Sequence, residues 1–242
     1  MSQIRYNARS HVGLKRRVNE DAVLALPAEQ IFLVADGMGG HEAGDYASRL
    51  IADMVAALPP GLPPAERMQA LRDTIRQAHD LIRAEAAARG GVTIGATVAC
   101  LMLANGHFAA FWAGDSRIYR LGRHPEAPVG IEMLTTDHSV VAPLVTSGQI
   151  TWDEAEQLPQ SNQITRAVGV GEVLELDKLR GEIRQGDRFL ICSDGLTKYA
   201  TFATLERVLR QAPLETAADQ LVQIALDGGG ADNITVLVID VL

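Results

Sequence analysis

Apolar runs alternate with polar, glycine-containing turns along the chain, and two of these runs end in the same way. Residues 31–35 are Ile-Phe-Leu-Val-Ala and are followed by Asp36 and a glycine-rich stretch. Residues 189–192 are again apolar and lead into Ser-Asp-Gly, with the aspartate at position 194. Short apolar runs bounded by glycine are typical of buried strands. The pattern therefore predicts Asp36 and Asp194 at strand ends, beside backbone that a ligand can approach closely.

A predicted hairpin places two aspartates opposite each other. The residues Pro-Ala-Glu-Gln at 27–30 predict a turn between two apolar runs. If they form the hairpin loop, Leu26 faces Ile31, and counting outward puts Asp21 opposite Asp36. Directly opposed residues of an antiparallel pair have Cβ atoms about 5 Å apart. Like charges at that distance are destabilising unless a cation lies between them, so the register favours a divalent metal here.

The remaining pattern predicts a mixture of helices and strands. Segments with apolar residues at helical spacing are expected to form helices at 41–58, 64–89, 202–210 and 214–226. Further strands are expected at 92–103, 108–113, 118–121 and 234–241, with Asn-Gly at 105–106 as a hairpin turn. Residues 122–170 are irregular apart from a short helical pattern at 153–158, and a segment of that kind is typical of a lid or binding loop.

Composition narrows the class of protein. The chain has 242 residues, 47% apolar and 21% charged, with a net charge of −8 and no basic stripe. This argues against a nucleic-acid partner and against an anionic membrane. Cys100 and Cys192 are expected to be buried core residues, not a disulfide framework. Residues 1–12 lack the apolar core of a signal peptide, and 92–104 is too short to span a bilayer. We expect a soluble, cytoplasmic protein.

Four aspartates are predicted at strand ends next to glycine or asparagine, namely Asp21, Asp36, Asp194 and Asp232. Glu20 and Asp115 are further candidates near them. Oxygen ligands without cysteine, and without histidine at metal spacing, suit Mg²⁺ or Mn²⁺ better than Zn²⁺. A two-metal site lowers the pKa of water and clamps phosphoryl oxygens. Arg16 or Arg17 could bind the phosphate through a bidentate contact. The residues thus favour a metal-dependent phosphoester hydrolase.

Each of these features has an ordinary structural explanation when it stands alone. An aspartate followed by glycine at a strand end is more often only a turn. Arg17 and Glu20 alone would be surface charges, and His41 and His138 are expected to be loop or capping residues. Only the whole set of aspartates at predicted strand ends indicates a metal site.

Eight segments of the chain resemble motifs of the PP2C-type (PPM) protein serine/threonine phosphatases, in the order in which that family has them. They are Arg16 with Asn-Glu-Asp at 19–21, Ala-Asp-Gly-Met-Gly-Gly at 35–40, Gly-Ala-Thr at 95–97, Gly-Asp-Ser-Arg-Ile-Tyr at 114–119, Leu-Thr-Thr-Asp-His-Ser at 134–139, Ile-Thr-Arg-Ala-Val-Gly at 164–169, Ser-Asp-Gly-Leu at 193–196 and Asp-Asn-Ile-Thr at 232–235. No single motif is decisive, but the ordered set is highly specific.

The resemblance implies an α+β fold, a β-sandwich of two antiparallel sheets flanked by pairs of helices, with the metals at one end. It covers nearly the whole chain, so residues 1–242 are expected to form a single domain. Within it, residues 135–170 would be a flap that shapes substrate access. The implied cofactors are two Mn²⁺ or Mg²⁺ ions per site.

The resemblance also implies metal ligands, residue by residue. Asp36, a catalytic residue, would bridge the two ions, and the Gly37 carbonyl would contact one of them. Asp21 would serve the second ion, and Asp194 and Asp232 the first.

Three further residues have other implied roles. Glu20 would act mostly through metal-bound water. Asp115 matches a ligand of a weaker third ion, shared with Asp194. Arg16 matches the catalytic, phosphate-binding arginine by its spacing to Glu20, and we prefer it to Arg17 for that reason.

One position departs from part of the family. Eukaryotic members have histidine where Met38 stands, and that histidine is their proposed general acid. Methionine cannot donate a proton, so leaving-group protonation would fall to metal-bound water or to another residue. Bacterial members commonly have methionine there, and the chain resembles the stand-alone bacterial phosphatases.

The expected function is hydrolysis of phosphoserine and phosphothreonine on proteins by a metal-activated water. The expected partners are phosphoproteins and a cognate Hanks-type kinase, of which those that regulate type VI secretion are one example, and the protein is expected to be a monomer. Alternatives are a hydrolase of small phosphate esters and a non-catalytic phosphoprotein-binding module, a pseudophosphatase. Pseudophosphatases usually lack one or more metal aspartates, whereas this chain has all of them. A calcium-binding structural protein would need a dense ligand loop, and no EF-hand pattern is present.

Overall fold

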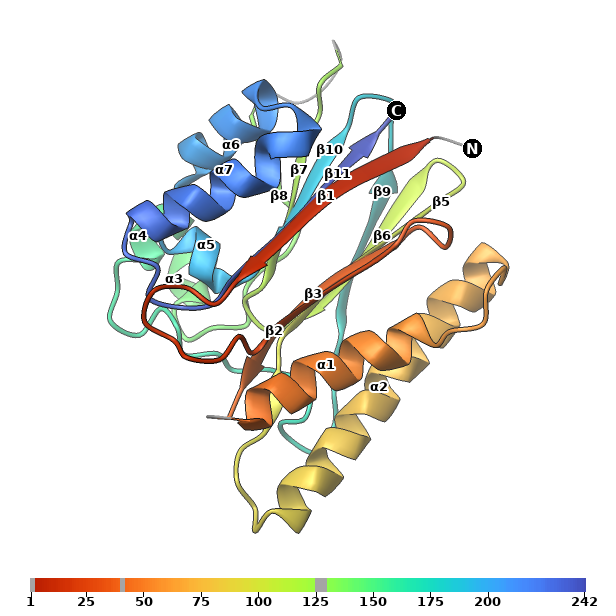
Figure 1. Ribbon diagram of the computed structural model, residues 1–242, viewed down its shortest axis with the longest axis vertical. Helices are drawn as coiled ribbons and strands as arrows, with labels where there is room; N and C mark the ends of the chain where they lie inside the picture. The colour runs from red at the N-terminus through yellow and green to blue at the C-terminus, as the bar shows by residue number, and fades with distance from the viewer. Residues whose placement is uncertain (1–2, 40–41, 125–129) are drawn as a thin grey trace.

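The computed structural model describes residues 3–39, 42–124 and 130–242. Gly40 is the last residue of the motif at 35–40, and His41 is the residue expected to lie in a loop or to cap a helix. Both lie outside the described residues. Two antiparallel sheets face each other, and a pair of long helices covers the outer side of each sheet (Figure 1). The predicted α+β class and the β-sandwich are therefore confirmed.

The first sheet has five strands, in the order β1 (Ile4–His11), β11 (Ile234–Val241), β10 (Arg188–Cys192), β7 (Arg117–Leu121) and β8 (Glu132–Met133). Its outer face is covered by α6 (Phe202–Gln211) and α7 (Leu214–Asp227).

The second sheet has the order β2 (Asp21–Leu26), β3 (Ile31–Met38), β5 (Val98–Ala104), β6 (His107–Ala113) and β9 (Asp177–Glu182), and β4 (Gly95–Ala96) pairs with the end of β3. Its outer face is covered by α1 (Glu42–Ala56) and α2 (Pro64–Ala88). Three short helices, α3 (Ala142–Thr146), α4 (Trp152–Ala155) and α5 (Asp194–Thr197), lie near one end of the strands.

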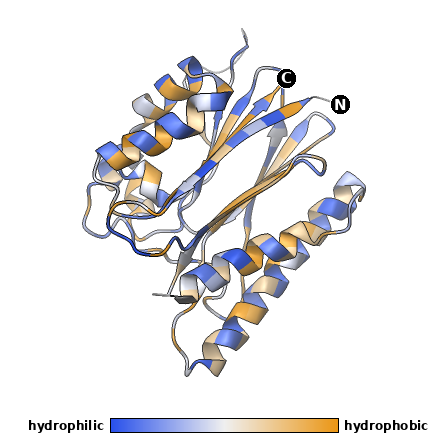
Figure 2. Ribbon diagram, viewed as in Figure 1, coloured by the Kyte–Doolittle hydropathy of each residue, from blue (hydrophilic) through white to orange (hydrophobic). Residues whose placement is uncertain are grey.

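The first five residues of β3, 31–35, are all apolar because both faces of the strand are covered. Successive side chains of a strand point to opposite faces of the sheet. Ile31, Leu33 and Ala35 pack in the core beneath α1 and α2. Phe32 and Val34 pack in a second core between the two sheets. Both faces of the strand are thus buried, and the central strands in Figure 2 are correspondingly apolar.

The predicted hairpin register is confirmed. Leu26 pairs with Ile31, and Asp21 pairs with Asp36 across β2 and β3. The second predicted hairpin, at 105–106, is confirmed as well, because both turn residues have positive φ angles of 50° and 76°. Those angles suit a two-residue type I′ turn, which asparagine and glycine favour.

The structure differs from the predicted elements in several places. The predicted strand at 92–103 begins at Gly95 and is interrupted at Thr97, whose amide donates to the Asp36 carbonyl at 2.8 Å. Strands β1 and β9 have no counterpart among the predicted elements. Both lie at an edge of their sheet and carry charged side chains, which protect an exposed edge from pairing with another chain. Their polarity hides them from a search for apolar runs.

The structure also shows the state of the two cysteines and the character of the helices. Cys100 and Cys192 are free and buried, as predicted. Among the helices that the structure describes, none combines the length and apolar character needed to cross a membrane.

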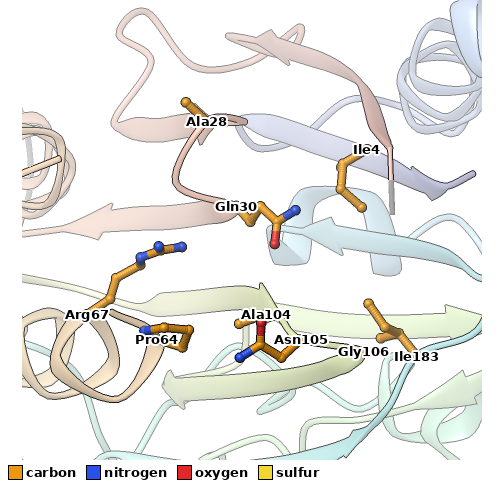
Figure 3. A pocket seen from close by; sticks show the side chains of 9 residues that line it. All are labelled: Ile4, Ala28, Gln30, Pro64, Arg67, Ala104, Asn105, Gly106 and Ile183. Atoms are coloured by element: carbon orange, nitrogen blue, oxygen red, sulfur yellow. The ribbon is translucent and has the colours of Figure 1, made fainter. Parts of the chain in front are cut away.

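A cavity of about 460 Å³ lies at the end of the sandwich where β3 begins (Figure 3). Its polar side chains are Gln30, Arg67 and Asn105, and no carboxylate lines it. The predicted metal ligands cluster instead at the other end of β3, beyond Asp36.

Candidate active site

A cavity of about 370 Å³ opens where β3 ends and brings together most of the predicted site residues. It is lined by Arg16, Glu20, Asp36, Gly37, Met38, Gly39, Thr97, Asp115, Asn162, Ile164, Asp194 and Asp232. These residues come from the loop before β2, the end of β3, the junction of β4 and β5, the turn before β7, the 135–170 segment, the residues just after β10 and those just before β11. Because β10 and β11 are antiparallel, the end of one strand and the start of the other meet at the same edge of the sheet.

Asp21 is the one predicted ligand that does not line this cavity. Its side chain is buried behind the cavity and accepts a hydrogen bond from the Ser193 hydroxyl at 2.8 Å. The same hydroxyl accepts a hydrogen bond from the Thr235 amide at 3.0 Å. Ser193 therefore joins the sheet carrying β10 and β11 to the sheet carrying Asp21.

Two glycines allow the chain segments of the site to approach closely. A Cβ atom at Gly37 would collide with the carbonyl oxygens of Gly44 and Glu20. A Cβ atom at Gly195 would collide with the carbonyl oxygen of Asn233. Any other residue at either position would push apart the segments that carry the carboxylates.

Asn233 holds the loop that presents Arg16. Its side-chain oxygen accepts from the Glu20 amide at 2.8 Å, and its side-chain nitrogen donates to the carbonyls of Val12 and Val18 at 2.9 and 3.0 Å. Arg16 itself donates to Asp232 at 2.8 Å. The structure thus places Arg16 at the cavity, and it provides Arg17 with no such position.

A short chain of hydroxyl groups supports two of the aspartates. The Asp36 amide donates to the Thr97 hydroxyl at 3.0 Å, and this hydroxyl lies 2.7 Å from that of Ser116. Asp115 immediately precedes Ser116 in the turn before β7. Thr97, Ser193 and Ser116 lie inside motifs recognised in the sequence, but no role could be assigned to them there. Ile164 likewise begins a recognised motif, at 164–169, without an assigned role, and no motif singled out Asn162.

Burial, and after it mutual repulsion, raises the pKa of the carboxylates of the site. Burial raises the pKa of Asp21 to about 7, and the charges of Asp194 and Asp232 add to it. Burial, followed by the charge of Asp232, raises the pKa of Asp194 to about 6. Burial, followed by the charge of Asp21, raises the pKa of Asp36 well above its ordinary value. Burial raises the pKa of Asp115 in the same way.

The site fits hard divalent cations. Three buried oxygens, Oδ1 of Asp21, Oδ1 of Asp194 and Oε1 of Glu20, have no hydrogen-bond partner. Buried carboxylates without partners are costly, and cations bound by oxygen ligands would satisfy them. In the described part of the chain, no three His, Cys, Asp or Glu side chains stand as a preformed ligand set. Arg16 occupies one oxygen of Asp232, so binding an ion there would require this half-exposed side chain to move.

These pKa shifts predict how stability without metal depends on pH. The buried aspartates of the site bind more protons in the folded protein than in the unfolded chain between the ordinary aspartate value of 3.8 and about 7. Stability should therefore fall as pH rises through this window. We expect Tm in EDTA to be lower at about pH 8 than at about pH 5, by about 4–8 °C for a loss of about 2 kcal/mol.

Thermal unfolding in EDTA across this pH range checks the prediction. The Asp21→Asn variant serves as the control, because it removes one titrating group and should flatten the dependence. A Tm that rises from about pH 5 to about pH 8 would contradict the assigned direction of the shifts.

A family model described as Protein phosphatase 2C matches residues 9–227 of the chain. The chain belongs to the protein phosphatase 2C family. The resemblance predicted from the ordered motifs is thereby confirmed. Solved phosphatase structures also align with the whole length of this chain.

PppA of Pseudomonas aeruginosa, described as a key regulatory component of T6SS, aligns with 100% of this chain and 99% of its own, at 38% identity and a TM-score of 0.90. The catalytic domain of the serine/threonine phosphatase PstP, solved in complex with two manganese ions, has a TM-score of 0.88 and 34% identity over 100% of both chains. PstP of Mycobacterium tuberculosis is 36% identical to this chain over 99% of its length. The match covers only 45% of PstP, so this chain spans less than half the length of that relative.

Proposed function

We propose that this protein is a metal-dependent phosphatase that hydrolyses phosphoserine and phosphothreonine on proteins. The observation that carries the proposal is the shared cavity, in which Asp36, Asp194 and Asp232 converge beside Arg16. Family membership and the likeness to serine/threonine phosphatases support the same activity.

The metal ligands in this proposal are the buried carboxylates. Asp36 would be shared by two ions, one of them also held by Asp21 and the other by Asp194 and Asp232, and the Gly37 carbonyl would contact one of the two. The complex of PstP with two manganese ions supports Mn²⁺ or Mg²⁺ as the metal. Bound there, such ions lower the pKa of water and neutralise charge on phosphoryl oxygens.

Two more carboxylates would assist these ligands. Glu20, whose Oε1 is buried without a partner, would act mostly through metal-bound water, as the family resemblance implies. Asp115 would serve a weaker third ion together with Asp194, and both line the same cavity.

Arg16 would bind the phosphate. Its guanidinium lies at the cavity and is half-exposed, so it can exchange Asp232 for a substrate oxygen without leaving a buried charge. Met38 also lines the cavity, but its thioether carries no proton to donate. Leaving-group protonation would therefore depend on solvent or another residue.

Substitution of Arg16 by alanine should weaken phosphate binding. A hydrogen bond to a charged group contributes about 1.5–3 kcal/mol, so we expect the KM for a phosphoester and the Ki for inorganic phosphate to rise about 10- to 100-fold. Metal affinity should persist, because the metal ligands remain.

Arg17→Ala is the matched control and should change both constants little. Steady-state kinetics and manganese titration of the two variants check the prediction. If Arg17→Ala weakened phosphate binding and Arg16→Ala did not, the assignment would be wrong by one residue.

The remaining features of the proposal concern the cellular role. The description of PppA as a T6SS regulatory component supports a bacterial signalling role, in which the phosphatase reverses a Hanks-type kinase. We further propose that the chain acts in the cytoplasm as a monomeric single domain, with 135–170 as its flap.

A comparison of two substrates tests the proposed substrate class. Purified protein with Mn²⁺ should hydrolyse a phosphothreonine peptide with a kcat/KM at least as high as that for p-nitrophenyl phosphate. Turnover of the small ester alone would favour a small-ester hydrolase. Binding of the phosphopeptide without turnover of either substrate would contradict the phosphatase proposal and favour a pseudophosphatase.

A further inference from the structure

The two arms of the flap pair with each other and are fastened to the metal site. The Val140 amide donates to the Gln163 carbonyl at 2.9 Å, and the Thr165 amide donates to the His138 carbonyl at 2.7 Å. His138 also binds the turn before β7. Its amide donates to the Gly114 carbonyl at 3.0 Å, and its Nδ1 accepts from the Gly114 amide at 3.1 Å. The flap therefore rises from a paired stem that adjoins the turn carrying Asp115.

Arg117, the first residue of β7, connects this stem to the middle of the flap. Its side chain is buried, with 4% of its surface exposed. Nε and Nη2 donate to Asp137 at 3.0 and 2.6 Å, and Nη2 lies 2.7 Å from a carboxylate oxygen of Glu156. Its guanidinium lies 5.0 Å from the ring centre of Trp152. One cation thus binds the root of the flap and both ends of α4.

Helix α4 is attached on a second side as well. The Asp153 carboxylate accepts from the Phe202 amide, at the start of α6, at 3.1 Å. Thr151 and Glu154 form a capping box at the start of α4. This short helix is therefore held in place by its ends and by its neighbours, since so few residues do not form a stable helix alone.

The segment after α4 leads directly into the active-site cavity. Asn162 and Ile164 line that cavity, although both belong to the flap. A smaller adjoining cavity is lined by Arg117 and Glu156 together with Asn162, which belongs to both. The position of Asn162 and Ile164 over the metal site thus depends on where α4 is anchored.

Building on the proposed phosphatase activity, we propose that Arg117 is a positioning residue that sets how the flap receives the peptide part of a substrate. It acts by holding Glu156 and Asp137 on one guanidinium, which fixes α4 against the sheet. A phosphopeptide must pass the flap to reach the metals, whereas p-nitrophenyl phosphate occupies only the metal end of the cavity.

The chemistry of arginine suits this role better than that of lysine. The planar guanidinium binds a carboxylate through two parallel hydrogen bonds and lies flat against an aromatic ring. Lysine offers a point charge that cannot do both. Removing the cation altogether would leave two largely buried carboxylates unpaired, which is strongly destabilising. The most informative variants therefore keep a charge or remove only one partner.

Two variants test the proposal with one matched control. Glu156→Gln removes the charge that holds the end of α4 to Arg117 but keeps the pair between Arg117 and Asp137, and Arg117→Lys weakens both contacts. The control is Arg120→Lys, on the same strand, whose partner Asp187 is also buried but lies outside the flap. We expect both test variants to raise KM for a phosphothreonine peptide about tenfold with kcat nearly unchanged, while their kinetics on p-nitrophenyl phosphate match those of wild type.

Hydrogen exchange supplies a readout that does not depend on turnover. In both test variants, exchange should accelerate at amides 152–164 and stay unchanged in β10 and β11, and Arg120→Lys should leave 152–164 unaffected. Equal losses on both substrates, or unchanged exchange at 152–164, would overturn the positioning role. If the wild type hydrolysed neither substrate, the proposed function would fail, and the exchange pattern would still decide whether Arg117 anchors the flap.

Discussion

Asp36→Asn is expected to abolish phosphatase activity, with a fall in kcat of about 10³-fold or more, equivalent to about 4 kcal/mol of transition-state stabilisation. Asp36 lies at the end of β3, opposite Asp21, and lines the cavity with Asp194 and Asp232. Asparagine keeps the shape of the side chain but removes the negative charge that two cations would share. Both ions should therefore bind less tightly, and both are needed for the proposed chemistry.

The same substitution should stabilise the protein without metal. The pKa of Asp36 is raised by burial and by the charge of Asp21, so the wild-type site carries electrostatic repulsion that the variant lacks. We expect a higher Tm in EDTA for Asp36→Asn than for wild type at about pH 8. This result would separate loss of activity from loss of folding.

Kinetics, manganese titration and thermal unfolding of Asp36→Asn check both expectations. Asp53→Asn, a substitution at an exposed position of α1, is the control and should behave as wild type. Full activity in Asp36→Asn would show that the metal site has been assigned to the wrong residues.

The largest expected effect on stability lies far from the active site, at Arg188. This arginine is 1% exposed. It binds Asp240 through Nε and Nη2 at 2.6 and 2.7 Å, and its Nη1 donates to the carbonyls of Leu209 and Ala212 at 2.9 and 2.7 Å. Those two carbonyls belong to the end of α6, where arginine satisfies groups that the helix itself leaves unpaired.

Arg188→Met should lower the free energy of unfolding by about 3–5 kcal/mol, because it leaves Asp240 and two helix carbonyls without their main donor. For a domain of this size, that corresponds to a fall in Tm of about 6–20 °C. The activity of the folded fraction should be unchanged, since Arg188 does not line the active-site cavity.

The matched control is Arg5→Met, which breaks an exposed ion pair between Arg5 and Glu215. Exposed pairs contribute little, so we expect a change within about 1 kcal/mol. Denaturant unfolding of both variants checks the difference. Equal effects at the two positions would contradict the structural role assigned to Arg188.

The sequence predicted those parts of the fold that local patterns encode. The pairing of Asp21 with Asp36 followed from loop length and alternation, and the structure has that register. Strand β1 escaped prediction because its pairing with β11 depends on a distant partner. Its Arg5 and Arg9 bind Glu215 and Asp219 of α7, so polar positions of the strand also have structural partners that no local pattern reveals.

In the candidate site, too, local patterns could be predicted and contacts between distant residues could not. Its aspartates could be predicted because each lies at a strand end within a recognisable motif. The contacts of Arg117 could not, because Asp137 and Glu156 approach it only after the 135–170 segment folds back on the sheet. Asn162 reaches the cavity for the same reason; its segment was predicted to be a lid or binding loop, but no pattern singled out this residue within it.

The most direct test of the metal-dependent phosphatase account is hydrolysis of a phosphothreonine peptide by the purified protein with EDTA, Mg²⁺ or Mn²⁺. The account predicts turnover that EDTA removes and that Mn²⁺ or Mg²⁺ restores. Absence of turnover with either ion, in protein that measurably binds metal, would contradict it and make Met38 the first residue to examine.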